Sequence, residues 1–218
     1  MNRASRLRGC FKLLAIIVFC ASTAAHAARV DPLKESRPLI RGGIVYKAYC
    51  VVCHGEAGNG IARATKLYQA EKLIINEAPI ADYEKIIRLG GEPLGRSPYM
   101  PPWQDELSEE QLGDVVAYLA VVRRAELRGE LVFKTNCILC HGVAGDGKGR
   151  AAVLYDPKPS NLLLSDKSEL YKRTIINLGG KAMGRSALMP PWGLQLSKQE
   201  MDDVLSYLQK LSVVPVLP

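Results

Sequence analysis

The run Cys-x-x-Cys-His occurs twice in this chain, once in each half. On one helical turn, two thiols three residues apart can each bond a porphyrin vinyl group, while the next residue presents its imidazole to the iron. This spacing predicts two covalently bound haem c groups. The predicted thioether positions and proximal iron ligands are Cys50, Cys53 and His54, and Cys137, Cys140 and His141.

A Cys-x-x-Cys pair has three other possible roles: a redox-active dithiol, half of a zinc site, or a disulfide. A structural zinc site needs four N, S or O ligands, and neither half offers a fourth beyond a carboxylate. A thioredoxin-like dithiol belongs to a βαβ setting, whereas the flanking residues here are typical of helices. Haem attachment therefore explains the pattern better than these alternatives.

The remaining cysteines and histidine, Cys10, Cys20 and His26, fall within residues 1–27. This segment has basic residues up to Lys12, an apolar run over 13–21, and small residues at its end, which predicts a secretory signal cleaved after Ala27 and export to the periplasm. The apolar run is shorter than the roughly 20 residues of a membrane span, although an uncleaved tether is the alternative. Bulky Phe19 before Cys20 argues against a lipoprotein.

The net charge of the full chain is +7, from 29 basic and 22 acidic residues. Four of the basic residues lie in the predicted signal, so 25 minus 22 leaves +3 for the rest. The surplus lies in residues 126–218, with 12 basic and 9 acidic groups against 13 and 13 in residues 28–125. Haem propionates would offset this charge, so we expect no nucleic-acid partner.

Residues 28–218 are an internal duplication. Residues 41–68 align with 128–155 at an offset of 87, and residues 86–119 align with 175–208 at an offset of 89. We therefore predict two tandem domains, 28–122 and 123–218, each wrapped around one haem. Because each half is near the lower size limit for a self-sufficient core, a buried haem would supply part of its apolar interior.

Helical patterns open and close each half. The expected closing helices begin with the capping boxes Ser108-x-x-Gln111 and Ser197-x-x-Glu200 and continue with apolar residues at i, i+3, i+4 and i+7. In the expected opening helices, a glycine and an aromatic residue precede the first cysteine by eight and four residues. The glycine would let two helices cross closely. Since strand patterns are nearly absent, the predicted fold class is all-α.

The sixth iron ligands follow from elimination. In the first half Met100 is the one methionine, and no free His or Cys remains. In the second half Met183, Met189 and Met201 compete, but only Met189 aligns with Met100 and precedes the same Pro-Pro-Trp. Two prolines stiffen such a loop. We predict Met100 and Met189 as ligands, with Met201 packed on its helix stripe and Met183 also packed.

Two roles remain open for four further residues. Trp103, Trp192, Arg96 and Arg185 occupy equivalent positions in the two halves, where they could contact haem propionates. Packed indoles and solvated arginines explain them equally well. The glycines after each haem motif resemble a phosphate-binding loop only loosely, because no Lys-Ser/Thr pair follows, and turn formation explains them.

These shared features resemble the class I cytochrome c family over nearly all of residues 28–218, and the tandem is most similar to the dihaem cytochrome c4 type of bacterial periplasms. The resemblance implies an all-α fold, His/Met-ligated iron and electron transfer. It also implies a loop in which a proline carbonyl accepts the ring N–H of the proximal histidine. Residues 156–162 of the second half match this loop, whereas the first half has no proline between His54 and Pro79.

Two functional classes follow. The first is a carrier of single electrons between redox proteins, either free or as the cytochrome subunit of a larger oxidoreductase, with a membrane-bound oxidase or reductase as a possible partner. The second is a dihaem enzyme of the peroxidase or thiosulfate dehydrogenase type, which needs an iron with an open or labile position. Two methionine loops of one design favour the carrier, with no small-molecule substrate and no turnover of its own.

Overall fold

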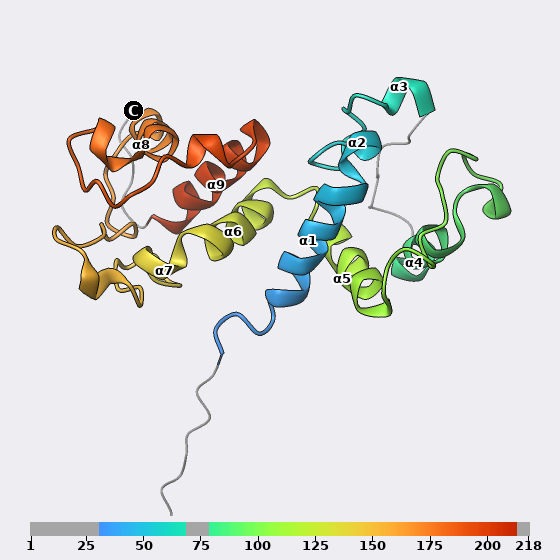
Figure 1. Ribbon diagram of the computed structural model, residues 1–218, viewed down its shortest axis with the longest axis horizontal. Helices are drawn as coiled ribbons and strands as arrows, with labels where there is room; N and C mark the ends of the chain where they lie inside the picture. Colours follow the sequence, from blue (N-terminus) through green and yellow to red (C-terminus); the bar gives the residue numbers. More distant parts are fainter. Residues whose placement is uncertain (1–30, 69–78, 213–218) are drawn as a thin grey trace, which may run out of the picture. The chain divides into compact units, whose positions relative to one another are not determined.

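Helices pack in pairs in both halves of the computed structural model, which describes residues 31–68 and 79–212 (Figure 1). Met1–Asp31 and Pro32–Pro218 are separate units, and the predicted signal peptide 1–27 lies outside the described residues. Across 31–68 and 79–212 no strand occurs, in agreement with the all-α prediction. No helix within these two ranges is long and apolar enough to cross a membrane.

The first half runs from the opening helix α1 to the closing helix α5. The described helices in this half are α1 (Arg37–Tyr49), α2 (Val51–His54), α3 (Thr65–Tyr68), α4 (Ile80–Leu89), η1 (Glu92–Leu94) and α5 (Glu109–Leu119). The second half repeats the order with α6 (Ala125–Asn136), α7 (Ile138–His141), η2 (Ala152–Leu154), α8 (Glu169–Ala182), η3 (Trp192–Leu194) and α9 (Lys198–Leu211). Equivalent helices thus occupy equivalent places in the two halves.

Both closing helices begin at the predicted capping boxes. Ser108 Oγ accepts from the Gln111 backbone N–H at 3.2 Å, and Gln111 Oε1 accepts from the Ser108 N–H at 2.9 Å. Ser197 and Glu200 form the same pair of bonds, at 3.1 and 2.8 Å. Such an N-cap contributes about 1 kcal/mol to helix stability, because it satisfies backbone donors that no helical carbonyl can reach.

Each opening helix crosses its closing helix at a glycine. A Cβ atom on Gly42 would lie 2.0 Å from the Asp114 carbonyl oxygen, and one on Gly129 would lie 1.9 Å from that of Asp203. No other residue fits at these distances, which confirms the predicted close crossing. Aromatic rings also pack at each crossing: the ring centroids of Tyr46 and Tyr118, and those of Phe133 and Tyr207, are 5.4 Å apart.

The apolar stripes of α5 and α9 form the cores of the two halves. Their buried members are Leu112, Val115, Val116 and Leu119 in α5 and Met201, Val204, Leu205 and Leu208 in α9. Each large aliphatic side chain so buried stabilises the fold by roughly 1.5–3 kcal/mol. The burial of Met201 agrees with its predicted packing role.

The connection between the halves is short and partly buried. Val121 and Val122 are buried directly after α5, and α6 begins at Ala125. Leu131 of α6 belongs to the same apolar cluster as the residues of α1 and α5. The chain therefore passes from α5 to α6 without a flexible linker, while the boundary between residues 122 and 123 stays a prediction.

Candidate haem-binding sites

One helical turn holds each Cys-x-x-Cys-His motif at the end of an opening helix. In α2 the Cys53 and His54 amides donate to the Cys50 carbonyl at 3.2 and 2.9 Å. In α7 the amides of Cys140 and His141 donate to the Cys137 carbonyl at the same two distances. All four cysteines are half-buried and free of disulfides. The two motifs therefore present their thiols and imidazoles in the same way.

The first thiol of each motif is poorly suited to thiolate chemistry. Burial raises the pKa of Cys50 to about 12, and the neighbouring Cys53 adds to the shift. Burial likewise raises the pKa of Cys137 to about 12, with Cys140 adding to it. A reactive dithiol or a zinc ligand needs a low thiol pKa. Among the described residues, no group of three His, Cys, Asp or Glu side chains could hold a metal ion.

His141 is oriented as an iron ligand requires. Its Nδ1–H donates to the Ser160 carbonyl oxygen at 3.1 Å, which leaves Nε2 with its lone pair. Burial lowers the pKa of His141, partly offset by this bond, so the ring is neutral at neutral pH. The acceptor differs from the one implied by the family resemblance, which was a proline carbonyl. Instead the Pro159 carbonyl faces Gly147, where an added Cβ would lie 2.5 Å from it, and the next carbonyl along reaches His141.

The surroundings of His54 are described only in part. Its carbonyl accepts from the Gly60 amide at 3.0 Å, and Tyr46 Oη–H donates to the next carbonyl, that of Gly55, at 2.8 Å. These bonds anchor the backbone that carries the imidazole. Residues 69–78, where the counterpart of the Ser160 loop would fall, lie outside the described residues. An acceptor for the His54 ring therefore stays unassigned.

Paired glycines position the two methionine loops. The Gly91 amide donates to the Met100 carbonyl at 2.9 Å, and the Gly180 amide donates to the Met189 carbonyl at 3.0 Å. The preceding Gly90 has a φ of +78°, and its added Cβ would lie 2.8 Å from the Met100 carbonyl oxygen. The second half repeats this arrangement. The sequence reasoning passed over these glycines, although the Gly-Gly pair recurs at the same offset as the methionines.

The side chains of Met100 and Met189, which these two loops carry, are both half-buried. Met100 also packs against the core of the first half. Met183 follows α8 as its C-terminal cap and is half-buried too. The assignment of Met100 and Met189 as sixth ligands stays a prediction.

The four residues with open roles lie near the same loops. Trp103 packs against Tyr49, with ring centroids 5.2 Å apart, and Trp192 is half-buried. Arg185 Nε donates to the Tyr171 hydroxyl at 3.1 Å and is otherwise exposed, as is Arg96. The first tryptophan thus has an ordinary packing role, and propionate contacts stay a prediction for all four.

Apolar side chains beside the thiols fit a large, flat, apolar cofactor. Val52 is 56% exposed between the first pair of cysteines, and its equivalent Leu139 is 59% exposed between the second pair. Leu67 and Leu154, which are also equivalent, are 72% and 77% exposed. Apolar area repeated at these positions, together with paired thiols and a neutral imidazole, matches the donor set of haem c.

Family comparisons agree with this site. A family model described as Cytochrome c matches residues 127–212, and one described as Cytochrome C oxidase, cbb3-type, subunit III matches residues 38–119. Each match begins in an opening helix and reaches the closing helix of its half. The chain is therefore a class I c-type cytochrome with two haem domains, and its cofactor is covalently bound haem c.

The relatives that it matches are oxidase subunits. It is 24% identical over 211 residues to the cbb3-type cytochrome c oxidase subunit CcoP of Azospirillum brasilense, covering 87% of this chain and 69% of that protein. It is 25% identical over 180 residues to subunit FixP of Azorhizobium caulinodans, covering 78% of this chain and 58% of that protein. Its placement with the cytochrome c4 type stays a prediction.

One solved structure also matches. This is a chain of the Kuenenia stuttgartiensis reducing HAO-like protein complex, with 24% identity, coverage of 79% of this chain and 96% of that one, and a TM-score of 0.36.

Proposed function

We propose that this chain carries single electrons between redox proteins through two His/Met-ligated haems and turns over no substrate of its own. The observation that carries the proposal is the repeated site. Each half presents a Cys-x-x-Cys-His turn and a methionine loop closed on a Gly-Gly pair, with backbone bonds of 2.9 and 3.0 Å. When bound, haem c supplies a one-electron iron couple. In each half the histidine and the methionine would both hold the iron, which would leave it no site for substrate.

The chain's own groups favour this use. The Ser160 carbonyl fixes the His141 ring and raises its basicity as a ligand. The glycine bonds hold the methionine backbone in place before and after electron transfer. Because such ligands need little movement when the iron changes charge, we infer fast electron transfer at both sites.

We further propose that the two haems exchange electrons within the chain, in the periplasm, after removal of residues 1–27. The short join and the apolar cluster shared by α1, α5 and α6 support a close association of the halves. Electron exchange falls steeply with distance, so this association favours an internal path over two independent carriers.

The relatives favour a particular setting for this carrier. These relatives are subunits of a cbb3-type oxidase, so a membrane-bound oxidase is the acceptor that we propose to test first. Stopped-flow mixing of the reduced protein with such an oxidase should oxidise both haems. Turnover of peroxide or thiosulfate by the isolated protein would instead support the enzyme class.

A further inference from the structure

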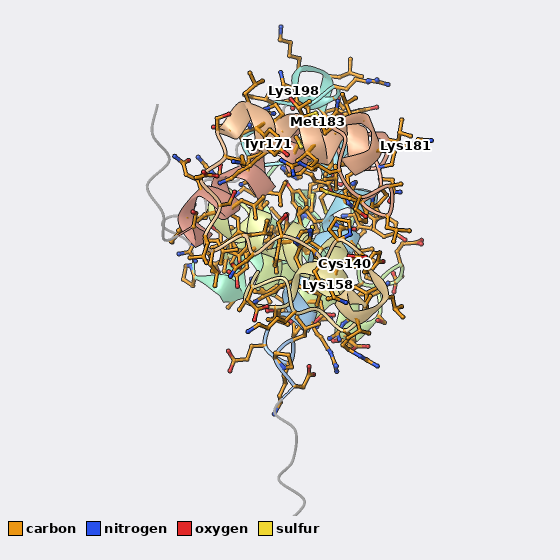
Figure 2. All side chains as sticks on the ribbon, turned by 90° about the vertical axis from the view of Figure 1, so that its left-hand side faces the viewer. Cys140, Lys158, Tyr171, Lys181, Met183 and Lys198 are labelled. Atoms are coloured by element: carbon orange, nitrogen blue, oxygen red, sulfur yellow. The ribbon has the colours of Figure 1, made fainter. Side chains whose placement is uncertain are left out.

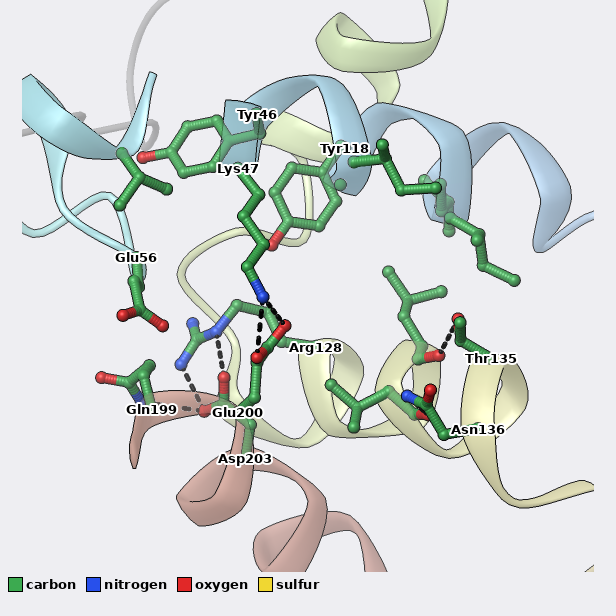
Figure 3. Close-up of a pocket in the computed structure, with 17 residues that line it drawn as sticks. Tyr46, Lys47, Glu56, Tyr118, Arg128, Thr135, Asn136, Gln199, Glu200 and Asp203 are labelled. Atoms are coloured by element: carbon green, nitrogen blue, oxygen red, sulfur yellow. Dashed lines mark hydrogen bonds and ion pairs between the residues drawn. The ribbon is translucent and has the colours of Figure 1, made fainter. Parts of the chain in front are cut away.

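Two polar contacts join the haem-binding segment of the first half to the start of α9. The Ser197 hydroxyl donates to a Glu56 carboxylate oxygen. Lys47 Nζ donates to both carboxylate oxygens of Glu200, at 2.8 and 2.9 Å (Figure 3). Glu56 follows His54 by two residues, and Ser197 is the N-cap of α9, which follows the Met189 loop. These contacts therefore link the segments that hold the two predicted irons.

We propose that these four residues, Lys47, Glu56, Ser197 and Glu200, form an interdomain latch that fixes the orientation in which the two haems exchange electrons. The inference rests on the proposed function and adds the positioning residues for its internal step. None of the four belongs to the predicted ligand set.

The two acidic residues of the latch are not repeated at the equivalent positions of the other half. The equivalent of Glu56 in the second half is Val143, which has no group to accept a hydrogen bond. The equivalent of Glu200 in the first half is Gln111, which forms the same capping box without a charge. Each acid is thus present only in the half in which a donor from the other half, Ser197 or Lys47, bonds to it.

The second lysine of the repeat confirms this asymmetry. Lys134, the equivalent of Lys47, pairs with Glu130 on its own helix at 2.6 Å and donates to Ser36 at 2.7 Å. Ser36 belongs to the first half, so this bond also joins the halves, at a place away from the four latch residues. Lys134 thus reaches the first half through a serine hydroxyl, whereas Lys47 reaches the second half through the Glu200 carboxylate.

The packing between the helices beneath the latch is incomplete. A cavity of about 140 Å³ lies between α1 and α6, with Lys47, Glu56 and Glu200 at its lining. A gap of this kind forfeits the dispersion contacts that would otherwise fix the register of two helices. Buried Arg128 and Asp203 also line it and bond to each other at 2.6 and 2.7 Å, which stiffens α6 against α9 (Figure 3).

The strength of the latch lies in the carboxylate bonds. An exposed ion pair alone contributes little, and Lys47 is 57% exposed. The Ser197 hydroxyl on the Glu56 carboxylate is a charge-assisted bond, which is stronger than a neutral one. Together they can shift the ratio of docked to undocked orientations by about tenfold.

The test uses the full-length holoprotein and replaces each acid with the residue of the other half. Glu56→Val with Glu200→Gln removes both contacts, while glutamine at 200 preserves the capping box as Gln111 does. We would measure the haem-to-haem distance distribution by pulsed dipolar EPR and the internal electron equilibration after flash reduction. We expect a broader distribution and about a tenfold smaller fraction of fast-exchanging molecules, with unchanged haem spectra.

A matched pair of serine variants controls for helix capping. Ser197→Ala and Ser108→Ala each remove an N-cap serine, but only Ser197 bonds to the other half. Only Ser197→Ala should broaden the distances. If the double variant had the same haem-to-haem distance distribution and the same rate of electron exchange as the wild type, the latch would be overturned. If the double variant lost its haem, Lys47→Met would replace it in the same two measurements. A wild-type protein with one narrow distance but no exchange would contradict the proposed function and leave the latch standing.

Discussion

The carbonyl oxygen of Ser160 lies 3.1 Å from Nδ1 of His141. Because a carbonyl oxygen can only accept, this contact places the proton on Nδ1 and leaves the lone pair of Nε2 available to bind iron. The loop that supplies this carbonyl contains two prolines, Pro157 and Pro159, and the first half has none at the corresponding place. The segments that follow the two haem motifs thus differ in sequence, and we expect the two haems to differ in potential.

Pro159→Ala should raise the reduction potential of the second haem, by tens of millivolts at most. Without the proline ring the loop is freer, so the bond to His141 weakens, the imidazole becomes less basic, and the ferric state loses stabilisation. A potentiometric titration would measure this. A shift of both haems, or of the first alone, would contradict the assigned role of this loop.

Met100→Ala and Met189→Ala should each remove about half of the weak near-infrared sulfur-to-iron charge-transfer band of the ferric protein, because each takes away one of two axial thioethers. Absorption spectra of the purified variants would measure it. Met183→Ala is the control and should leave the band intact. Loss of the band in Met183→Ala would move the ligand assignment to that residue.

Arg128→Leu should lower the free energy of unfolding by about 3–5 kcal/mol, because it leaves Asp203 buried without its ion-pair partner. The side chains of this pair are 6% and 3% exposed. The equivalent Arg41→Leu should lower the free energy of unfolding by much less, since the Arg41 side chain is 46% exposed and water can replace it. Chemical denaturation would measure the free energy of unfolding of both variants. Equal losses of unfolding free energy in the two would contradict this account.

The Arg128→Leu variant should also reverse the usual pH dependence. Burial raises the pKa of Asp203 even though Arg128 and Gln199 donate hydrogen bonds to it, and removing Arg128 raises it further. A carboxyl with a higher pKa in the folded state stabilises the fold below its unfolded pKa and loses that contribution as pH rises through its folded pKa. Relative to wild type, stability should therefore fall from about pH 4 to pH 7. A difference in unfolding free energy between Arg128→Leu and wild type that stayed constant with pH would contradict this prediction.

Lysines of the second half should steer acidic partners to it. Lys148, Lys158 and Lys181 are exposed, and the view in Figure 2 shows Lys158 with Cys140 toward the middle and Lys181 with Met183 above. Lys158→Glu with Lys181→Glu should slow oxidation by anionic ferricyanide, and the slowing should fade as salt screens the charges. Lys34→Glu is the matched charge control. Oxidation rates that changed neither with salt concentration nor with the lysine substitutions would contradict this prediction.

Sequence reasoning reached the helices and their crossings because local rules decide them. The capping boxes, the apolar stripes and the crossing glycine Gly42 each act over a few residues or repeat in the second half. The family resemblance implied a proline carbonyl as the His141 acceptor, whereas the structure has the Ser160 carbonyl. Which carbonyl of a loop faces a ring depends on the path of the loop in space. Sequence reasoning did not predict the hydrogen bond between Ser197 and Glu56, because these residues are 141 positions apart. The one sequence feature that points to this contact is the difference between Glu56 and its equivalent in the repeat, Val143.

The most direct test of the central claim is a potentiometric titration of the purified holoprotein, followed by absorption and EPR spectroscopy. The account predicts two reversible one-electron components, both low-spin in the ferric state and both unable to bind carbon monoxide when ferrous, because a histidine and a methionine occupy the axial positions of each iron. A high-spin ferric component, or a ferrous haem that binds carbon monoxide, would contradict it.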